Sequence, residues 1–186
     1  MNITTIHYLN LFLGAGAIVL QILAVIALFL LFFTSKGSLK RNIFLNFIEK
    51  HFLIIGFLVS FFASFFSLVY SEIINFLPCQ LCWFQRIFLF PQVFLFGIAL
   101  WKKDKSVIKY STILLCIGFA ISIYQNLKYY FSDISNLPCD ASGVSCYQHL
   151  ISEFNGYISI PMLALTSFFV LLVITLVVHF YKKGTI

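Results

Sequence analysis

The chain has 186 residues, of which 61% are hydrophobic, 10% are charged and 24 are phenylalanine. A soluble domain is about 45–50% apolar and about 25% charged, so this chain has too little polar surface to cover a water-soluble particle. The formal net charge of +6 comes from short basic clusters between apolar runs, with no basic groove of interleaved aromatic residues. The composition therefore predicts an integral membrane protein surrounded by lipid and excludes nucleic acid as a partner.

Five apolar segments are long enough to cross a membrane as helices, which takes roughly 20 mostly apolar residues. They are residues 9–33, 52–70, 81–101, 107–127 and 157–181. The first has no Lys or Arg before it and is longer than the apolar core of a signal peptide, so we expect it to remain as a span. Its clearly polar members are Asn10 and Gln21. The predicted fold is an all-α membrane protein with five spans.

Basic residues gather in alternate connections and set the predicted orientation. Residues 1–8 and 71–80 contain no Lys or Arg, and residues 128–157 contain only Lys128. The other connections and the C-terminus are basic, and the positive-inside rule places them in the cytoplasm. The N-terminus is then outside and the C-terminus inside. These basic residues are Lys36, Lys40, Arg41, Lys50, Lys102, Lys103, Lys105, Lys182 and Lys183.

Two cysteine pairs fall on the predicted outer side, where disulfides can form and persist. The stretch "NFLPCQLCWFQR" (75–86) contains Cys79 and Cys82, and "NLPCDASGVSCYQH" (136–149) contains Cys139 and Cys146. Cys116 lies alone in the fourth span, where we expect a buried small apolar residue.

Structural staples, a zinc site and a redox centre are the three interpretations of these pairs. A Cys-x-x-Cys pair closes a small ring, so it is a weak staple but a familiar redox unit. A four-cysteine zinc site commonly uses Cys-x2-Cys spacing, whereas the second pair here is separated by six residues and faces an oxidising compartment. The spacing favours the redox interpretation, without a metal.

The surroundings of the first pair support redox chemistry. Pro78 favours a helix boundary, so Cys82 falls in the first turn of the third span. The positive end of a helix dipole stabilises a thiolate there. Arg86 follows four residues later, on the same helix face. We interpret it as a group that holds the thiolate and polarises a bound acceptor, the alternative being an arginine that extends to the outer headgroups.

The second pair lies in a connection of about thirty residues, which is long for a membrane hairpin and typical of a functional loop. The residues between its cysteines favour turns, so we expect a disulfide that a soluble thiol protein can attack. After it, an apolar stripe predicts a short amphipathic helix at the outer interface, or an extension of the fifth span. The stripe comprises Tyr147, Leu150, Ile151 and Phe154.

The segment "PCQLCWFQRIFLFPQ" (78–92), followed after two spans by a second cysteine pair and by "GYISIPMLALTSF" (156–168), resembles the DsbB-type disulfide bond formation proteins of bacterial membranes, including the BdbC branch. The resemblance covers about residues 52–181. Vitamin K epoxide reductases carry their loop cysteines before the Cys-x-x-Cys pair, the reverse of the order here. The resemblance implies a four-helix bundle over residues 52–186, with residues 1–51 forming an extra transmembrane helix and a cytoplasmic linker.

The same resemblance implies a quinone-dependent thiol oxidase of the bacterial cytoplasmic (inner) membrane, with its cysteine loops on the periplasmic or outer side. It would reoxidise a DsbA-like thioredoxin-fold thiol oxidase and pass electrons to ubiquinone or menaquinone from the membrane quinone pool. This activity supports disulfide bond formation in exported proteins. A reductive or isomerising protein on the same scaffold and a disulfide-stapled transporter are the alternatives.

The resemblance also implies roles for individual residues. Cys139 would form the mixed disulfide with the partner, and Cys146 would exchange with Cys79. Cys82 would contact the quinone, with Arg86 beside it. The family's second quinone-side residue, a histidine in some relatives, has no match before Cys139. Gln125 and Asn126 are the candidates for that part.

Overall fold

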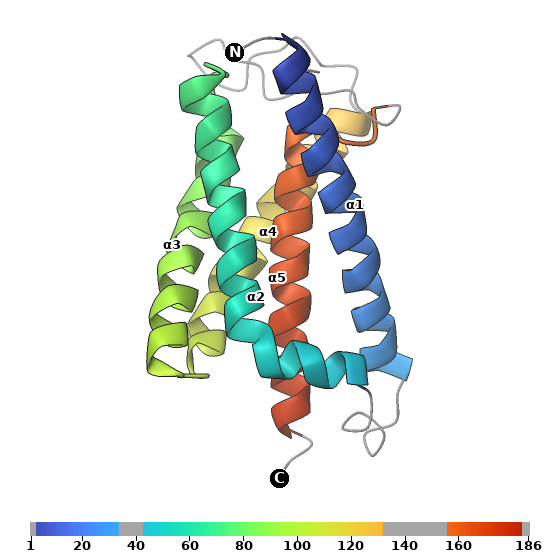
Figure 1. Cartoon of the computed structure of the whole chain (residues 1–186), viewed down its shortest axis with the longest axis vertical. Coiled ribbons are helices and arrows are strands. Elements are labelled where there is room, and N and C mark those ends of the chain that lie inside the picture. The colour runs from blue at the N-terminus through green and yellow to red at the C-terminus, as the bar shows by residue number, and fades with distance from the viewer. Residues whose placement is uncertain (1–2, 34–42, 132–155, 184–186) are drawn as a thin grey trace.

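The computed structural model describes residues 3–33, 43–131 and 156–183. They form α1 (Ile3–Phe33), α2 (Ile43–Leu68), which continues into the π-helical turn η2 (Val69–Ile73), α3 (Gln80–Lys102), α4 (Val107–Phe131) and α5 (Ile160–Lys183). The helices run alternately up and down the molecule (Figure 1). All five are long and apolar enough to cross a membrane. The all-α fold and the five spans are therefore confirmed.

The second span was predicted to start at residue 52, whereas α2 begins at Ile43. Its first turns lie across one end of the bundle before the helix bends upward (Figure 1). Leu45, Ile48 and Phe52 form the buried face of this part. Glu49 forms an ion pair with Lys105, which lies in the turn between α3 and α4; 2.6 Å separates Glu49 Oε1 from Lys105 Nζ. The residues before the predicted span thus form an amphipathic extension of α2. The position of the apolar run did not indicate this extension.

The fifth span was predicted from residue 157, but α5 begins at Ile160. Gly156 has φ +81°, a left-handed conformation that glycine adopts without steric cost and that starts no helix. Ser159 then accepts a hydrogen bond from the backbone N–H of Met162 through its Oγ, at 3.3 Å, as a helix-capping residue does. Pro161 fits the first turn, where its missing N–H is not needed. α1, in turn, begins at Ile3, earlier than predicted.

Helices α2, α3, α4 and α5 form a closed four-helix bundle. Each packs against the next, and α5 returns to α2. α1 packs against the outside of this bundle, mainly along α5, and makes few contacts with α2. α5 is the most buried helix, since α1, α2 and α4 all cover it.

Glycines allow close packing at two helix pairs. A Cβ at Gly118 of α4 would lie 2.3 Å from Phe168 of α5, and a Cβ at Gly56 of α2 would lie 2.8 Å from Phe96 of α3. Both phenylalanine side chains are fully buried. Small residues are used in this way in membrane bundles, where van der Waals packing drives association.

Gly118→Ala is therefore expected to destabilise the bundle by about 1–3 kcal/mol, because the added methyl group overlaps the fully buried Phe168 ring and one of the two must shift. Thermal unfolding in detergent, followed by circular dichroism, measures the change. Gly16→Ala is the matched control, since its added methyl group meets nothing within 4 Å and α1 tolerates alanine better than glycine. Equal unfolding temperatures for Gly118→Ala and wild type would contradict the packing argument.

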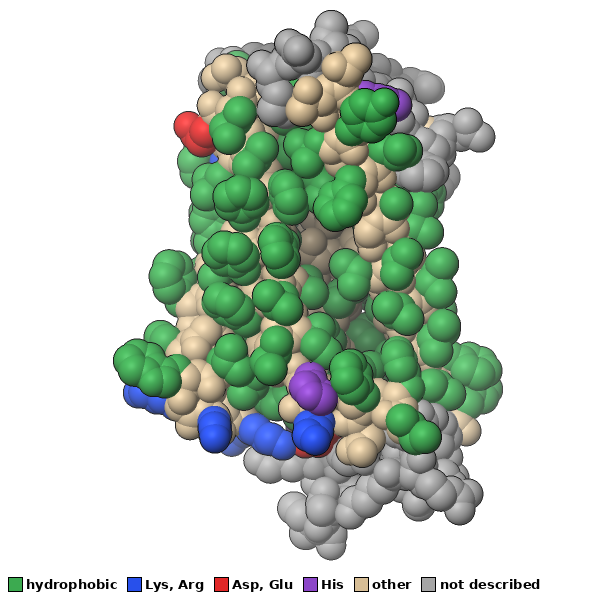
Figure 2. Space-filling model, in the orientation of Figure 1, with side chains coloured by type: hydrophobic (Ala, Val, Ile, Leu, Met, Phe, Trp, Pro, Cys, Tyr) green, Lys and Arg blue, Asp and Glu red, His purple; other side chains and the backbone are tan. Residues whose placement is uncertain are grey.

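The described surface has the polarity of a membrane protein. Apolar side chains cover the middle of the molecule, and Lys and Arg gather at the end where α3 turns into α4 (Figure 2). The start of α3, with Cys79, lies at the opposite end. Cys116 was expected to be buried, but it is exposed on the outside of α4. The expectation was wrong because position 116 faces away from α3 and α5, where lipid accepts an apolar thiol as well as a protein core does.

Candidate functional site

The first cysteine pair is built by the start of α3. Cys79 has an extended backbone and is the N-cap residue, and its sulfur accepts a 3.4 Å hydrogen bond from the backbone N–H of Cys82. Cys82 thus lies in the first turn, as predicted, and its sulfur is 3.0 Å from that of Cys79. Cys79 is 4% exposed. The local fold therefore holds both sulfurs together at the positive end of the helix dipole.

Cys79 holds its proton more tightly than an ordinary thiol. Its pKa is raised, first by the hydrogen bond to the Cys82 side chain and then by burial. In the reduced pair, the two thiols lie within hydrogen-bonding distance of each other, with 3.0 Å between their sulfurs.

A raised pKa means a smaller thiolate fraction at any given pH, so reduced Cys79 is expected to alkylate slowly. With iodoacetamide its rate should still climb above pH 9, past the ordinary thiol pKa of about 8.5. Cys82→Ala removes the main cause of the shift and should speed the reaction of Cys79 at pH 8. Mass spectrometry of the modified peptide reads the rate. A Cys79 rate unchanged by Cys82→Ala would contradict this assignment.

Two buried glutamines extend the site from α3 to α4. Gln125 Nε2 lies 3.6 Å from Cys79 Sγ and 3.7 Å from Cys82 Sγ, within donating distance of both. Gln85 Nε2 donates to Gln125 Oε1 at 2.8 Å and so fixes which way the Gln125 amide points. Gln125 is 1% exposed and Gln85 is 6% exposed. The pair of amides positions an N–H group against either sulfur.

Arg86 is buried beside the pair and does not extend to the membrane surface, being 7% exposed. Its Nε donates to Ser67 Oγ at 2.9 Å, and its Nη2 donates to the Ser67 carbonyl oxygen at 2.7 Å. Its guanidinium carbon also lies 5.2 Å from the centroid of the Trp83 ring. Nη1 makes no hydrogen bond to any described residue. Ser67 of α2 thus fixes the guanidinium through two of its five N–H groups.

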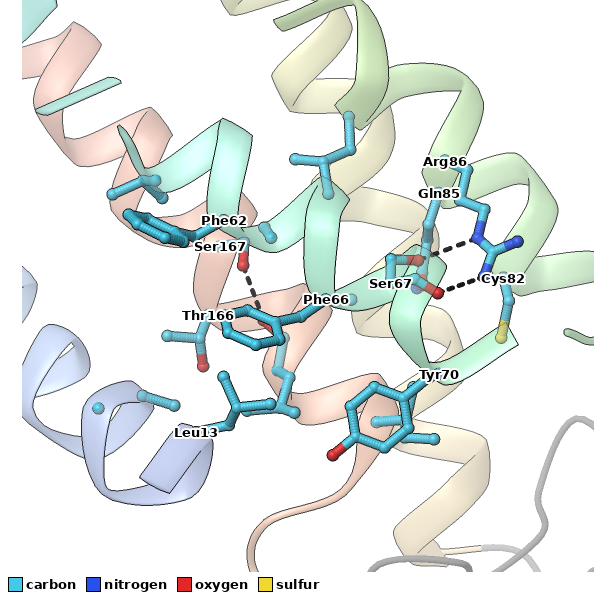
Figure 3. Close-up of a pocket in the computed structure, with 18 of the residues that line it drawn as sticks. Leu13, Phe62, Phe66, Ser67, Tyr70, Cys82, Gln85, Arg86, Thr166 and Ser167 are labelled. Carbon is cyan, nitrogen blue, oxygen red and sulfur yellow. Dashed lines mark hydrogen bonds between the residues drawn. The ribbon is translucent and has the colours of Figure 1, made fainter. Parts of the chain in front are cut away.

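A cavity of about 410 Å³ lies beside Cys82 and Arg86. Figure 3 shows Arg86, Gln85 and Cys82 of α3 beside Ser67 of α2 and Tyr70 of η2. The remaining lining is largely aromatic and aliphatic, and comes from α1, α2, α3 and α5. Figure 2 shows the face of the molecule hollowed between α1 and α2. The size falls within the range of small-molecule sites, which combine apolar walls with a few placed polar groups.

The structure does not bring every predicted site residue to this cavity. Gln125 contacts the sulfurs but does not line the cavity. Asn126 donates to the carbonyl oxygens of Ser122, at 2.8 Å, and Pro161, at 2.9 Å, and so links α4 to the start of α5. Cys139, Cys146 and the predicted amphipathic helix lie outside the described residues.

Sequence reasoning missed Gln85, Ser67, Tyr70 and the contribution of α1. Gln85 carried a signal, because a polar residue one turn after Cys82 in an apolar span is costly unless it is used. Ser67 and Tyr70 carried none, since serine and tyrosine are common near the ends of transmembrane helices. η2, which follows Ser67, is a π-helical turn of the kind often found at functional sites.

A cysteine pair at a helix start, beside a buried arginine and an apolar cavity in a helical membrane bundle, defines a membrane thiol–disulfide oxidoreductase. Comparison with known proteins agrees. The sequence model described as "Disulfide bond formation protein DsbB" matches residues 49–178. The chain belongs to the DsbB family, and it is a disulfide oxidoreductase of disulfide bond formation.

Named relatives in Bacillus support the assignment. The chain is 39% identical over 122 residues to the "Disulfide bond formation protein C" of Bacillus subtilis, covering 66% of this chain and 88% of the relative. It is 35% identical over 130 residues to the "Probable disulfide formation protein C 2" of Bacillus cereus, covering 70% of this chain and 92% of the relative. No solved structure matches the chain.

Proposed function

We propose that this protein is a thiol:quinone oxidoreductase of the bacterial cytoplasmic membrane that reoxidises a DsbA-like thioredoxin-fold protein on the outer side. One observation carries the proposal: Cys82 and Arg86 line the same cavity among the spanning helices. Membership of the DsbB family supports it, because a DsbA–DsbB–quinone route keeps the bacterial periplasm oxidising.

The cavity fits the headgroup of a quinone. A quinone is flat and apolar with two carbonyl oxygens, so it needs apolar walls and hydrogen-bond donors at one end. Arg86 and Tyr70 are polar residues of the lining, while Phe62, Phe66 and Leu163 supply apolar walls. When bound, a quinone would supply the acceptor for two electrons and two protons.

The chain's own cysteines supply the rest of the relay. In the first exchange, the two thiols of the partner become a disulfide and the Cys139–Cys146 disulfide becomes two thiols. In the second, Cys146 attacks Cys79 of the Cys79–Cys82 disulfide, and Cys139 resolves the mixed disulfide, so that the loop is oxidised again and Cys79 and Cys82 are reduced. Cys79 keeps one proton, Gln125 orients its N–H group toward both sulfurs, and Arg86 faces the ligand beside Cys82.

Two separate pairs meet two different physical requirements. Exchange with a soluble protein needs an accessible disulfide, whereas reaction with a lipid-soluble acceptor needs a pair fixed at membrane depth. A DsbA-like partner has a potential near about −120 mV, so only a stronger oxidant regenerates it. The predicted orientation, with both cysteine pairs on the outer side, follows from the distribution of lysines among the connections.

The experiment measures the rate at which the purified protein in detergent consumes quinone, without oxygen and with a reduced DsbA-like protein as electron donor. Ubiquinone-1 and a short-chain menaquinone are tried in turn, and their reduction is followed by absorbance. Wild type and Cys116→Ser should consume quinone, and Cys139→Ser should not. Cys116 is the matched control because it is exposed on α4, away from the site. Equal consumption by Cys139→Ser would overturn the relay, and no consumption with the cysteines locked as disulfides would favour a stapled transporter.

A further inference from the structure

The additional helix α1 forms one wall of the cavity beside Cys82. The family match begins at residue 49, so α1 lies outside it. Five α1 residues nevertheless line the cavity, at the helical spacing of one face: Phe12, Leu13, Gly16, Ala17 and Leu20. We propose that α1 is a quinone-binding helix that determines affinity for the apolar part of the quinone; this rests on the function proposed above.

The geometry of packing creates this wall. α1 packs along α5 and makes few contacts with α2, so the two helices leave a space between them. The opening lies on the hollowed face of the molecule, where lipid surrounds the helices (Figure 2). Without α1, the same side of the cavity would be formed by lipid chains, which offer no fixed shape. With α1 in place, residues of α1, α2, α3 and α5 all line the cavity.

Polar contacts hold α1 in register with the site. Asn10 Oδ1 accepts a hydrogen bond from the Tyr70 hydroxyl, and both residues are buried. Gln21 Nε2 donates to Thr166 Oγ1 at 2.6 Å, and Gln21 Oε1 accepts from the Tyr157 hydroxyl at 2.9 Å. Both clearly polar residues of this span are therefore used to fix it against the bundle, as interhelical hydrogen bonds do in membranes.

The contact through Tyr70 also connects α1 to the redox end of the cavity. Tyr70 lines the cavity and lies three residues after Ser67, which holds the Arg86 guanidinium. Asn10 of α1 is thus bonded to η2, and Arg86 is bonded to the last turn of α2, which leads into η2. Figure 3 shows Ser67 and Tyr70 on this continuous segment. A ligand with its polar end at Arg86 has its apolar remainder against α1.

Gly16 is the position at which this wall can be changed with least disturbance to the fold. It lines the cavity, and an added Cβ there meets nothing within 4 Å. A leucine side chain at this position would extend from that open space into the cavity assigned to the ligand. Ala15, the preceding residue, is exposed and does not line the cavity, so Ala15→Leu is the matched control.

The experiment measures the dissociation constant of ubiquinone-1 for the full-length protein in detergent, by quenching of tryptophan fluorescence. Gly16→Leu is expected to weaken binding about tenfold, a typical effect of overfilling a packed site, and Ala15→Leu to change it less than about twofold. The rate at which the donor protein reduces the Cys79–Cys82 disulfide without quinone should be the same in Ala15→Leu as in wild type. Equal quinone affinity for Gly16→Leu and wild type would overturn the role of α1.

Photo-cross-linking gives a second measurement, which uses the wild-type protein and therefore does not depend on whether Gly16→Leu folds. An azido-ubiquinone irradiated with the wild-type protein should label the α1 peptide that contains Gly16, and excess ubiquinone-1 should prevent labelling. Label confined to α2, α3 and α5 would overturn the inference while leaving the proposed function intact. Failure of wild type to bind any quinone would overturn the proposed function itself.

Discussion

Cys82→Ser is expected to abolish quinone reduction, lowering steady-state turnover at least ~10³-fold, since a group that reacts covalently has no substitute at its position. Serine keeps the size of the side chain, so the N-cap at Cys79 and the cavity should remain. The loss is expected in kcat for quinone reduction with a reduced DsbA-like protein as donor. Cys116→Ser, exposed on α4, should retain full turnover.

A single-turnover measurement distinguishes loss of the relay from damage to the fold. Without quinone, fully oxidised wild type should oxidise two equivalents of the reduced partner, because each cysteine pair accepts two electrons. Cys82→Ser should still oxidise one equivalent through Cys139 and Cys146. Full quinone turnover by Cys82→Ser, or failure to oxidise even one equivalent, would contradict the proposed division of labour between the pairs.

The transmembrane helices were predictable because lipid imposes one strong requirement on every span, namely a long apolar run. The position of Cys82 in the first turn of α3 was predictable for a local reason, as Pro78 marks the boundary. Local rules were weaker at the ends of helices. α5 begins three residues after the start of its apolar run, whereas α2 begins nine residues before the start of its apolar run.

The site was less predictable because tertiary contacts build it. Nothing local to Gln85 or Gln125 indicates that they meet, since they are far apart in the chain and join only when α3 packs on α4. Cys116 was wrongly expected to be buried, because an apolar residue in a span faces lipid as readily as protein. The division of the chain at residue 51, the outward orientation and the exchange through Cys139 and Cys146 remain predictions.

The polar residues of the spans were the most informative signal that the sequence offered. Asn10, Gln21, Gln85 and Arg86 all interrupt apolar runs, and each makes a hydrogen bond to another element in the structure. In water such residues would be unremarkable. In lipid an unsatisfied polar group costs several kcal/mol, so a retained one marks a contact or a site.

Arg86→Gln is expected to weaken ubiquinone-1 binding roughly 10–150-fold, the equivalent of losing a hydrogen bond to a charged group worth about 1.5–3 kcal/mol. The loss arises because glutamine lacks both the charge and the planar fork that places two N–H groups on Ser67 beside the cavity. Arg86→Lys keeps the charge without the fork, so an intermediate loss is expected. The dissociation constant measured by fluorescence quenching checks all three proteins.

Ser67→Ala separates the role of the guanidinium from that of its support. The substitution removes the acceptor of Arg86 Nε but leaves the Ser67 carbonyl oxygen bonded to Nη2, so the arginine stays charged and mostly in place. Binding should weaken only about fivefold, the value of one hydrogen bond. Wild-type quinone affinity in Arg86→Gln would show that Arg86 serves only to join α3 to α2. A larger loss in Ser67→Ala than in Arg86→Gln would show that the support, rather than the charge, determines binding.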